Sequence, residues 1–242
     1  MVEGADEQHA GHELRLDGAV VLENPMLSKR NARSTPGPLP DPASSLIFSA
    51  RRWPDSVDNQ DMVDLIEIVD YDPVWQTEFA AIGTALRGVL GDGALRVDHI
   101  GSTSVPGLAA KSVIDIQISV RSLEPLDAYK APLERLGLEY RADNPELTKR
   151  YFREAPGSRR THIHVRELGS FSQQLPLLFR DYLRAHPATA AEFARSKRRC
   201  ARQFRDDRQQ YVSAKEPFVW EIVRRADTWA QSVGWRPGPS DA

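Results

Sequence analysis

Two histidines separated by a single residue are the first feature of this sequence that could do chemistry. The run from His162 to Val165 alternates polar and apolar residues as a strand does. This pattern puts both imidazoles on one side and Ile163 and Val165 on the other. Two imidazoles at this spacing can reach one metal ion or one phosphate group. His162 and His164 are therefore candidate metal ligands or phosphate contacts, with His164 also a candidate general base, and the alternative is a pair of ordinary surface histidines.

A carboxylate lies on the polar side of a second expected strand. Alternation along residues 113–120, VIDIQISV, points Asp115, Gln117 and Ser119 to one face and aliphatic side chains to the other. Such a strand is enclosed, and a buried carboxylate needs a cation or a hydrogen-bond donor. Asp115 is therefore a candidate metal ligand and catalytic residue that needs a metal, another cation or a hydrogen-bond donor as its partner, and His99 from the preceding strand is a further candidate ligand. The alternative is a structural aspartate bonded to a loop amide.

The loop between these two strands, GSTSVPGLAAKS, is rich in glycine and hydroxyl side chains. Glycine lets a ligand approach the backbone closely, and amide and hydroxyl donors hold phosphate oxygens. We expect phosphate contacts from Gly101, Ser102, Thr103 and Ser104, with Lys111 as a further contact. The structural alternatives are a simple turn or helix cap for the Gly-Ser pair and a solvated surface side chain for the lysine.

Missing motifs exclude several enzyme classes. The sequence has no GxxxxGK[ST] phosphate loop and no GxGxxG following a strand, which excludes P-loop kinases and Rossmann enzymes. It also lacks a GxSxG elbow and an HExxH helix. The only cysteine, Cys200, excludes an internal disulfide and a zinc site built from several thiolates.

The charge is divided unevenly along the 242 residues. The chain has a formal net charge of -2, but residues 71–242 hold 26 basic and 21 acidic side chains, a net charge of +5. This mild excess suits a nucleotide or another phosphorylated small molecule and is weak for a nucleic-acid-binding protein. The basic run at residues 195–208 is interpreted as a solvated helix face. No run approaches the roughly 20 apolar residues of a membrane span, and a cytoplasmic protein is expected.

Regular patterning begins near Met62, which is an alternative translation start. Residues 1–61 are rich in acidic residues and proline and are expected to be a disordered extension. Within them, Asp17-Gly18 between short apolar runs is a weak hairpin signal. A flexible tail is expected over residues 231–242.

The patterning between these ends predicts an α/β protein with a mixed sheet and a helical C-terminal segment. Helices are expected over residues 72–90 and 124–137, and strands over residues 95–100, 113–120, 138–142, 149–155 and 159–168. Three further helices are expected, the first carrying Leu175, Leu178, Phe179, Tyr182 and Leu183, the second Phe193, Cys200, Phe204 and Tyr211, and the last Phe218, Ile222 and Trp229.

The run HIGSTSVPGLAAKSVIDI, residues 99–116, closely resembles the signature of the GrpB family. IEIVDYDPVW, RTHIHV and FRDYLRAHP are similar to further segments of that family, and the resemblance covers about residues 66–226. It implies a GrpB-like domain over residues 62–230 with the polymerase-beta-like fold of the nucleotidyltransferase superfamily. Lys215, in a segment similar to the family's closing helices, is expected to contact the ligand.

The resemblance implies that Gly101 and Ser102 bind triphosphate and that Asp115 binds a divalent metal, either Mg²⁺, Mn²⁺ or Zn²⁺. The superfamily's second carboxylate is replaced here by Gln117. One carboxylate with imidazoles favours Mn²⁺ or Zn²⁺ over a pair of Mg²⁺ ions. Two functions remain open: nucleotidyl transfer from a nucleoside triphosphate to an acceptor, or binding without catalysis, as in the accessory domain of actinobacterial dephospho-CoA kinases.

Overall fold

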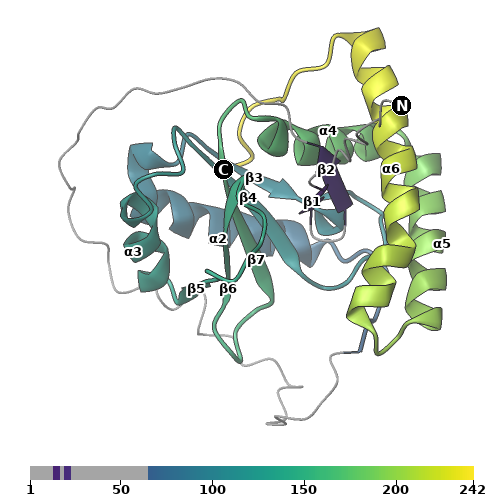
Figure 1. Cartoon of the computed structure of the whole chain (residues 1–242), viewed down its shortest axis with the longest axis horizontal. Helices are drawn as coiled ribbons and strands as arrows, with labels where there is room; N and C mark the ends of the chain where they lie inside the picture. The colour runs from purple at the N-terminus through teal and green to yellow at the C-terminus, as the bar shows by residue number, and fades with distance from the viewer. Residues whose placement is uncertain (1–12, 17–18, 23–64) are drawn as a thin grey trace, which may run out of the picture.

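A mixed five-stranded sheet forms the centre of the computed structural model, which describes residues 13–16, 19–22 and 65–242. The strand order is β3-β4-β7-β6-β5, with β4 and β7 parallel and all other neighbours antiparallel. The strands span Arg96–Ile100 (β3), Ile114–Val120 (β4), Leu138–Tyr140 (β5), Lys149–Glu154 (β6) and Thr161–Glu167 (β7). The predicted α/β class with a helix-flanked mixed sheet is confirmed (Figure 1).

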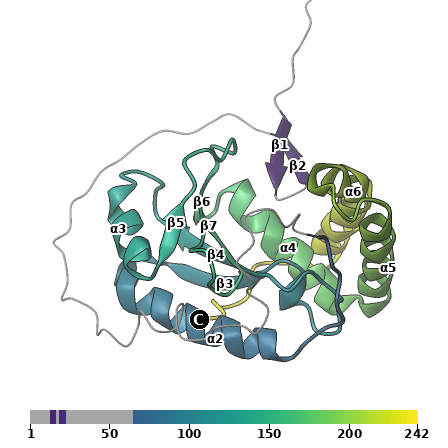
Figure 2. The ribbon, with the colours of Figure 1, turned by 90° about the horizontal axis from the view of Figure 1, so that it is seen from below.

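Helices α2 (Val74–Leu90) and α3 (Asp127–Arg135) cover the aliphatic face of the sheet. The predicted stripe of α2 is buried at Trp75, Phe79, Ile82 and Leu86. The helix ends at Gly91, whose φ of 50° favours glycine. Figure 2 shows α2 running along one face of the sheet.

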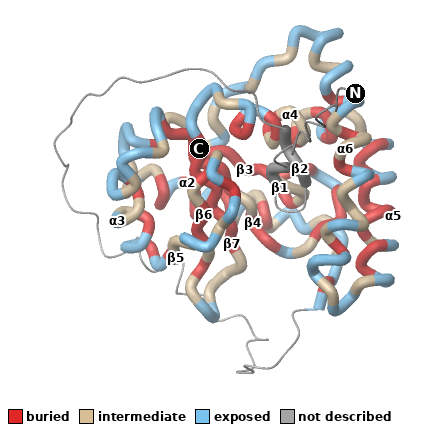
Figure 3. The backbone as a smooth tube through the Cα atoms, viewed as in Figure 1, coloured by how far each residue is buried: buried red, intermediate tan, exposed pale blue. Residues whose placement is uncertain are grey.

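The alternation predicted for β4 determines which side chains meet that helix layer. Ile114, Ile116 and Ile118 are fully buried in the core beside α2 and α3. Each such side chain contributes about 1.5–3 kcal/mol through burial. The strands of the sheet are buried along most of their length (Figure 3). Asp115 and Gln117 consequently point to the opposite face, which is polar.

The C-terminal helices are α4 (Phe171–Ala185), α5 (Pro187–Gln203) and α6 (Arg208–Val233), with α5 and α6 packed side by side (Figure 1). The sequence predicted a break between Tyr211 and Phe218, but the structure puts it at residues 204–207. Asp207 caps α6 by accepting a hydrogen bond from the Gln210 amide at 2.9 Å. Pro217 does not end α6, because burial of one helix face on both sides of it favours continuation.

The flexible tail predicted for residues 231–242 is corrected by the structure. Residues 231–233 belong to α6, and the segment 238–242 lies along β3. The Ala242 amide donates to the Val97 carbonyl at 3.1 Å, and Ser240 Oγ accepts from the Val97 amide at 2.8 Å. Asp241 Oδ2 accepts from the His99 amide at 2.9 Å and from Arg180 Nη1 at 2.6 Å. These polar pairings hold the segment in place.

Strands β1 (Glu13–Leu16) and β2 (Ala19–Leu22) pair antiparallel, as the Asp17-Gly18 signal predicts. The other expectations for residues 1–61, and Met62, lie outside the described residues. No helix among the described residues has the length and apolar character needed to cross a membrane.

Substitution Asp241→Ala tests the attachment of the C-terminal segment. Its loss leaves the buried His99 amide without its acceptor and removes one of the two carboxylates that Arg180 contacts, so we expect the free energy of unfolding to fall by about 1–3 kcal/mol. Urea denaturation measures this change. The exposed Asp227, changed to Ala, is the matched control on α6. Equal effects of the two substitutions would contradict the attachment.

Candidate functional site

Asp115, His162 and His164 come together because β4 and β7 are parallel neighbours in one register. Asp115 lies opposite His162, and Gln117 lies opposite His164. Asp115 Oδ1 is 3.2 Å from His162 Nδ1 and 3.5 Å from His164 Nε2. The imidazoles are 7% and 4% exposed and the carboxylate is 25% exposed. The predicted convergence of these three side chains is therefore present in the structure.

The three side chains have the donor atoms and spacing that a transition metal requires. One oxygen or nitrogen from each lies within 4.8 Å of the other two. A tetrahedral ion with bonds of about 2.0 Å separates its donors by about 3.3 Å, close to the two distances above. Two imidazoles and one carboxylate suit Zn²⁺ or Mn²⁺ better than Mg²⁺. The residues fit the expected divalent metal.

Asp115 is held in its ionised form. Burial acts to raise the pKa of this carboxyl, but hydrogen bonds and electrostatic interactions with His162 and His164 outweigh burial and hold the pKa well below its usual range. An ionised carboxylate is the state that binds a cation.

Gly101 packs directly against the Asp115 carboxylate. A Cβ atom at position 101 would lie 2.5 Å from Asp115 Oδ2, and the backbone φ there is +71°. Only glycine meets both conditions without strain. Gly101, predicted as a phosphate contact, thus has a structural role in shaping the floor of the site.

His99 does not join the metal-ligand cluster, so its predicted role as a ligand is wrong. It lies opposite Ile116 in the sheet register, and strand alternation therefore turns it to the aliphatic face. Its ring stacks on Phe79 at 4.7 Å, and Nε2 is 3.0 Å from Thr103 Oγ1. Burial lowers the pKa of His99 to about 3, so the ring is neutral.

Gln117 is fixed at both ends of its side-chain amide. Its Nε2 donates to the Gln173 carbonyl of α4 at 2.9 Å, and its Oε1 accepts from Arg166 Nη1 at 3.0 Å. A carboxylate at this position could not donate to Gln173. The polar contacts of position 117 therefore belong to the packing of α4 on the sheet.

The hydroxyl residues of the loop after β3 have different roles. Ser102 and Thr103 line a pocket beside Asp115. Thr103 Oγ1 also donates to the Val113 carbonyl at 3.0 Å, which fixes the loop to the start of β4. Ser104 does not line that pocket, because its hydroxyl donates to the Gly101 carbonyl at 2.6 Å. The structure therefore does not bring Ser104, a predicted phosphate contact, to the pocket.

This hollow, which we call the site pocket, has a volume of about 260 Å³. It joins the Asp115 carboxylate to four basic side chains, which we call the basic wall: Lys111, Lys197, Arg208 and Lys215. Its lining comprises Ser102, Thr103, Ala110, Lys111, Val113, Asp115, His162, Lys197, Arg208, Tyr211, Val212 and Lys215. Lys111 and Lys215, which were predicted to contact the ligand, both line this pocket. His162 lines the pocket, whereas His164 lies behind it in the sheet.

Lys197 and Arg208 are site residues that the sequence interpretation missed, since it assigned residues 195–208 to a solvated face. Lys197 is 3% exposed, and its Nζ donates to Ser102 Oγ at 2.9 Å and to the Ala109 carbonyl at 2.6 Å. A signal was available: Lys197 is four residues after Phe193 and three before Cys200, on the apolar stripe of α5. Arg208 had no comparable signal.

The basic wall is costly to keep charged. Burial, with nearby Arg208 and Lys215, lowers the pKa of Lys111 to about 8. Burial also lowers the pKa of Lys197 well below its usual value. An anion in the pocket would favour the charged form of both lysines.

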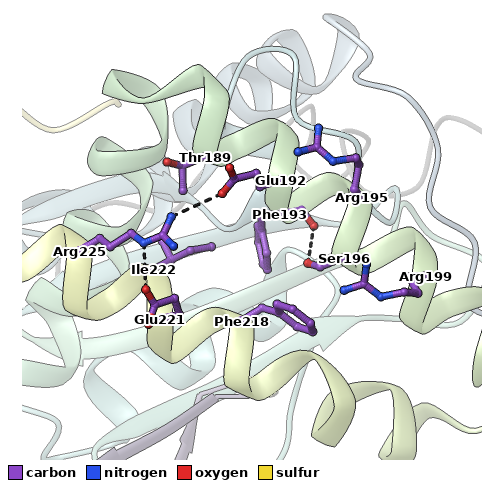
Figure 4. Close-up of a pocket in the computed structure, with 10 residues that line it drawn as sticks. All are labelled: Thr189, Glu192, Phe193, Arg195, Ser196, Arg199, Phe218, Glu221, Ile222 and Arg225. Carbon is purple, nitrogen blue, oxygen red and sulfur yellow. Dashed lines mark hydrogen bonds and ion pairs between the residues drawn. The ribbon is translucent and has the colours of Figure 1, made fainter.

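A second hollow of about 270 Å³ lies on the surface between α5 and α6 (Figure 4). Its Arg225 is already paired with Glu221 at 3.0 Å and Glu192 at 3.4 Å. These ion pairs therefore neutralise the charge of Arg225 in this hollow, in contrast to the basic wall of the site pocket.

The sequence and structure were compared with known proteins. A family model described as GrpB protein matches residues 65–225. The chain belongs to the GrpB family. The UPF0157 protein YqkA of Bacillus subtilis is 35% identical over 164 residues, covering 68% of this chain and 48% of YqkA. A dephospho-CoA kinase of Mycobacterium leprae is 36% identical over 197 residues, covering 70% of this chain and 48% of the kinase.

The chain thus spans about half the length of these two relatives. The crystal structure of the conserved protein GrpB from Enterococcus faecalis aligns with a TM-score of 0.62 and 34% identity. The alignment covers 67% of this chain and 99% of the other. The family resemblance expected from residues 99–116 is confirmed.

Gly101→Ala tests the packing of Gly101 on the carboxylate. The added Cβ displaces Asp115, so we expect Zn²⁺ or Mn²⁺ affinity, measured by calorimetry, to fall at least about tenfold. Gly107→Ala is a matched control, because Gly107 also has a positive φ, +76°, but nothing lies within 4 Å of the added Cβ. Equal metal affinity in the two variants would contradict the role of Gly101.

Proposed function

We propose that this GrpB-family protein binds a nucleoside triphosphate with a divalent cation in the site pocket and transfers its nucleotidyl group to an acceptor. The observation that carries the proposal is the joining, in one pocket, of a carboxylate and histidine cluster to a basic wall. Cation ligands on one side and lysines on the other are the chemistry that phosphoryl chains require.

The residues divide between two tasks. Asp115, His162 and His164 would hold the cation, which when bound supplies positive charge to phosphate oxygens. The basic wall would bind and orient the phosphate chain. His164 is assigned as a ligand and not as a base, because its imidazole does not line the pocket.

Binding without transfer is the second candidate function, and Gln117 favours it. The side-chain amide of Gln117 is hydrogen-bonded to Arg166 and to the Gln173 carbonyl. The polar face of β4 therefore offers one carboxylate, Asp115, whereas a two-metal mechanism needs more than one. The name of the dephospho-CoA kinase relative is consistent with an accessory domain attached to an enzyme.

Calorimetric titration of ATP, CTP, GTP and UTP, with and without Mn²⁺, Zn²⁺ or Mg²⁺, tests the binding step. We expect metal-dependent binding, and Asp115→Asn is expected to weaken it at least about tenfold because a neutral amide binds cations poorly. Asp143→Asn, at an exposed loop position, is the control. Undiminished binding by Asp115→Asn would contradict the proposal.

Transfer is separated from binding by measuring pyrophosphate release from the bound triphosphate in the presence of a heat-treated cell extract as the source of acceptors. Release that is lost in Asp115→Asn supports nucleotidyl transfer. Metal-dependent binding with no pyrophosphate release favours the accessory function.

Triphosphate affinity is expected to fall as the pH rises through about 8. The pKa of Lys111 is lowered to about 8, so below that pH the lysine is charged and attracts phosphate. Above it, binding must first take up a proton, which weakens affinity. Dissociation constants measured from about pH 6.5 to about pH 9.5 test this. Lys111→Arg stays charged and should lose the fall near pH 8, and an unchanged profile would contradict the assignment.

A further inference from the structure

We infer that the site pocket recognises its ligand through the polyphosphate chain and does not read the base. This inference rests on the proposed function, since it concerns the same pocket. It assigns a ligand class, a chain of several phosphates carrying any nucleoside, and it follows from the charge of the pocket and from the few groups available for other contacts.

The charge of the lining favours a multiply charged anion. Among the described residues, the pocket lining holds four basic side chains, Lys111, Lys197, Arg208 and Lys215, and a single carboxylate, Asp115. Within the described part of the chain, Lys197 has neutral oxygens as its hydrogen-bond acceptors. A chain of phosphates with one divalent cation complements this wall better than a single phosphate does.

The two hydroxyl side chains that the loop after β3 contributes to the lining already have hydrogen-bond partners within the protein. Ser102 Oγ accepts from Lys197, and Thr103 Oγ1 donates to the Val113 carbonyl. No Asn, Gln or Glu is among the described residues that line the pocket. The side-chain amides that best distinguish one base edge from another are therefore missing from this lining.

The two rings of the described lining, His162 and Tyr211, are both buried and therefore poorly placed for stacking. Tyr211 is 1% exposed. The ammonium groups of Lys111 and Lys215 lie over its ring, 5.4 Å and 5.5 Å from the centroid. A base needs an open ring face to stack on a protein. Tyr211 instead supports the two lysines that face the phosphates.

Competition against a fluorescent ATP analogue at a fixed, saturating free Mn²⁺ concentration tests this inference. We expect ATP, CTP, GTP and UTP to compete within about threefold of one another, with inorganic tripolyphosphate in the same range. AMP should compete at least about 100-fold more weakly, because it lacks two phosphates and their charged hydrogen bonds.

The outcomes separate this inference from the proposed function. A preference of more than about tenfold for one triphosphate, or failure of tripolyphosphate to compete, overturns the polyphosphate assignment while leaving nucleotide binding intact. If neither the analogue nor tripolyphosphate binds, the proposed function fails as well.

A charge-neutral variant gives an independent measurement. Lys215→Met keeps most of the unbranched side chain but removes its charge, so we expect the affinities for all four triphosphates and for tripolyphosphate to fall by the same factor. Arg195 is exposed on α5 and lines the hollow between α5 and α6. Arg195→Met is therefore the matched control and should change none of these affinities. A loss confined to one nucleotide in Lys215→Met would contradict charge-based recognition.

Discussion

The parallel register between β4 and β7 is the constraint on which the whole site depends. It puts Asp115 beside His162 and Gln117 beside His164, on the face of the sheet away from α2. A slip of one residue would turn both imidazoles into the apolar core and bring Ile163 to the site. The isoleucines of β4, buried between the sheet and α2, prevent that slip, so the same hydrophobic packing that folds the protein also positions the cation ligands.

The polar face of the sheet is enclosed, and its charges are satisfied by specific partners. Lys149 and Glu146 form a buried ion pair at 2.9 Å, and Arg166 reaches the Gln117 amide. Such groups cost free energy wherever a partner is missing. The site pocket differs from this enclosed layer, because its lysines line a hollow that an incoming anion can enter.

Local patterning was sufficient to predict most of the sheet and the central triad. Alternation along each strand correctly placed Asp115, His162 and His164 on polar faces, and the family signature then linked the Gly-Ser loop to them. His99 was misplaced because its polar type was given more weight than its position: alternation along β3 puts it on the same side as Val97, which is buried in the core. Ser104 was misplaced because loop hydroxyls can bond their own backbone.

The basic wall shows where single-sequence interpretation reaches its limit. Lys197 and Arg208 are separated from Asp115 by more than 80 residues, and only the folding of α5 and α6 beside the loop brings them to it. A run of arginines and lysines gives the same composition whether its members face solvent or a ligand. The helix boundary at residues 204–207 was similarly decided by the packing of α6, which overrode the signal of Pro217.

The segment that lies along β3 has a consequence for how this protein behaves among its neighbours. A sheet edge with open backbone donors and acceptors invites strand addition by another chain, which leads to aggregation. Here Ser240, Asp241 and Ala242 bond the edge of β3 from within the molecule. The opposite edge, β5, is only three residues long. Both margins of the five-stranded sheet are thereby closed to growth, which protects the protein against edge-to-edge association.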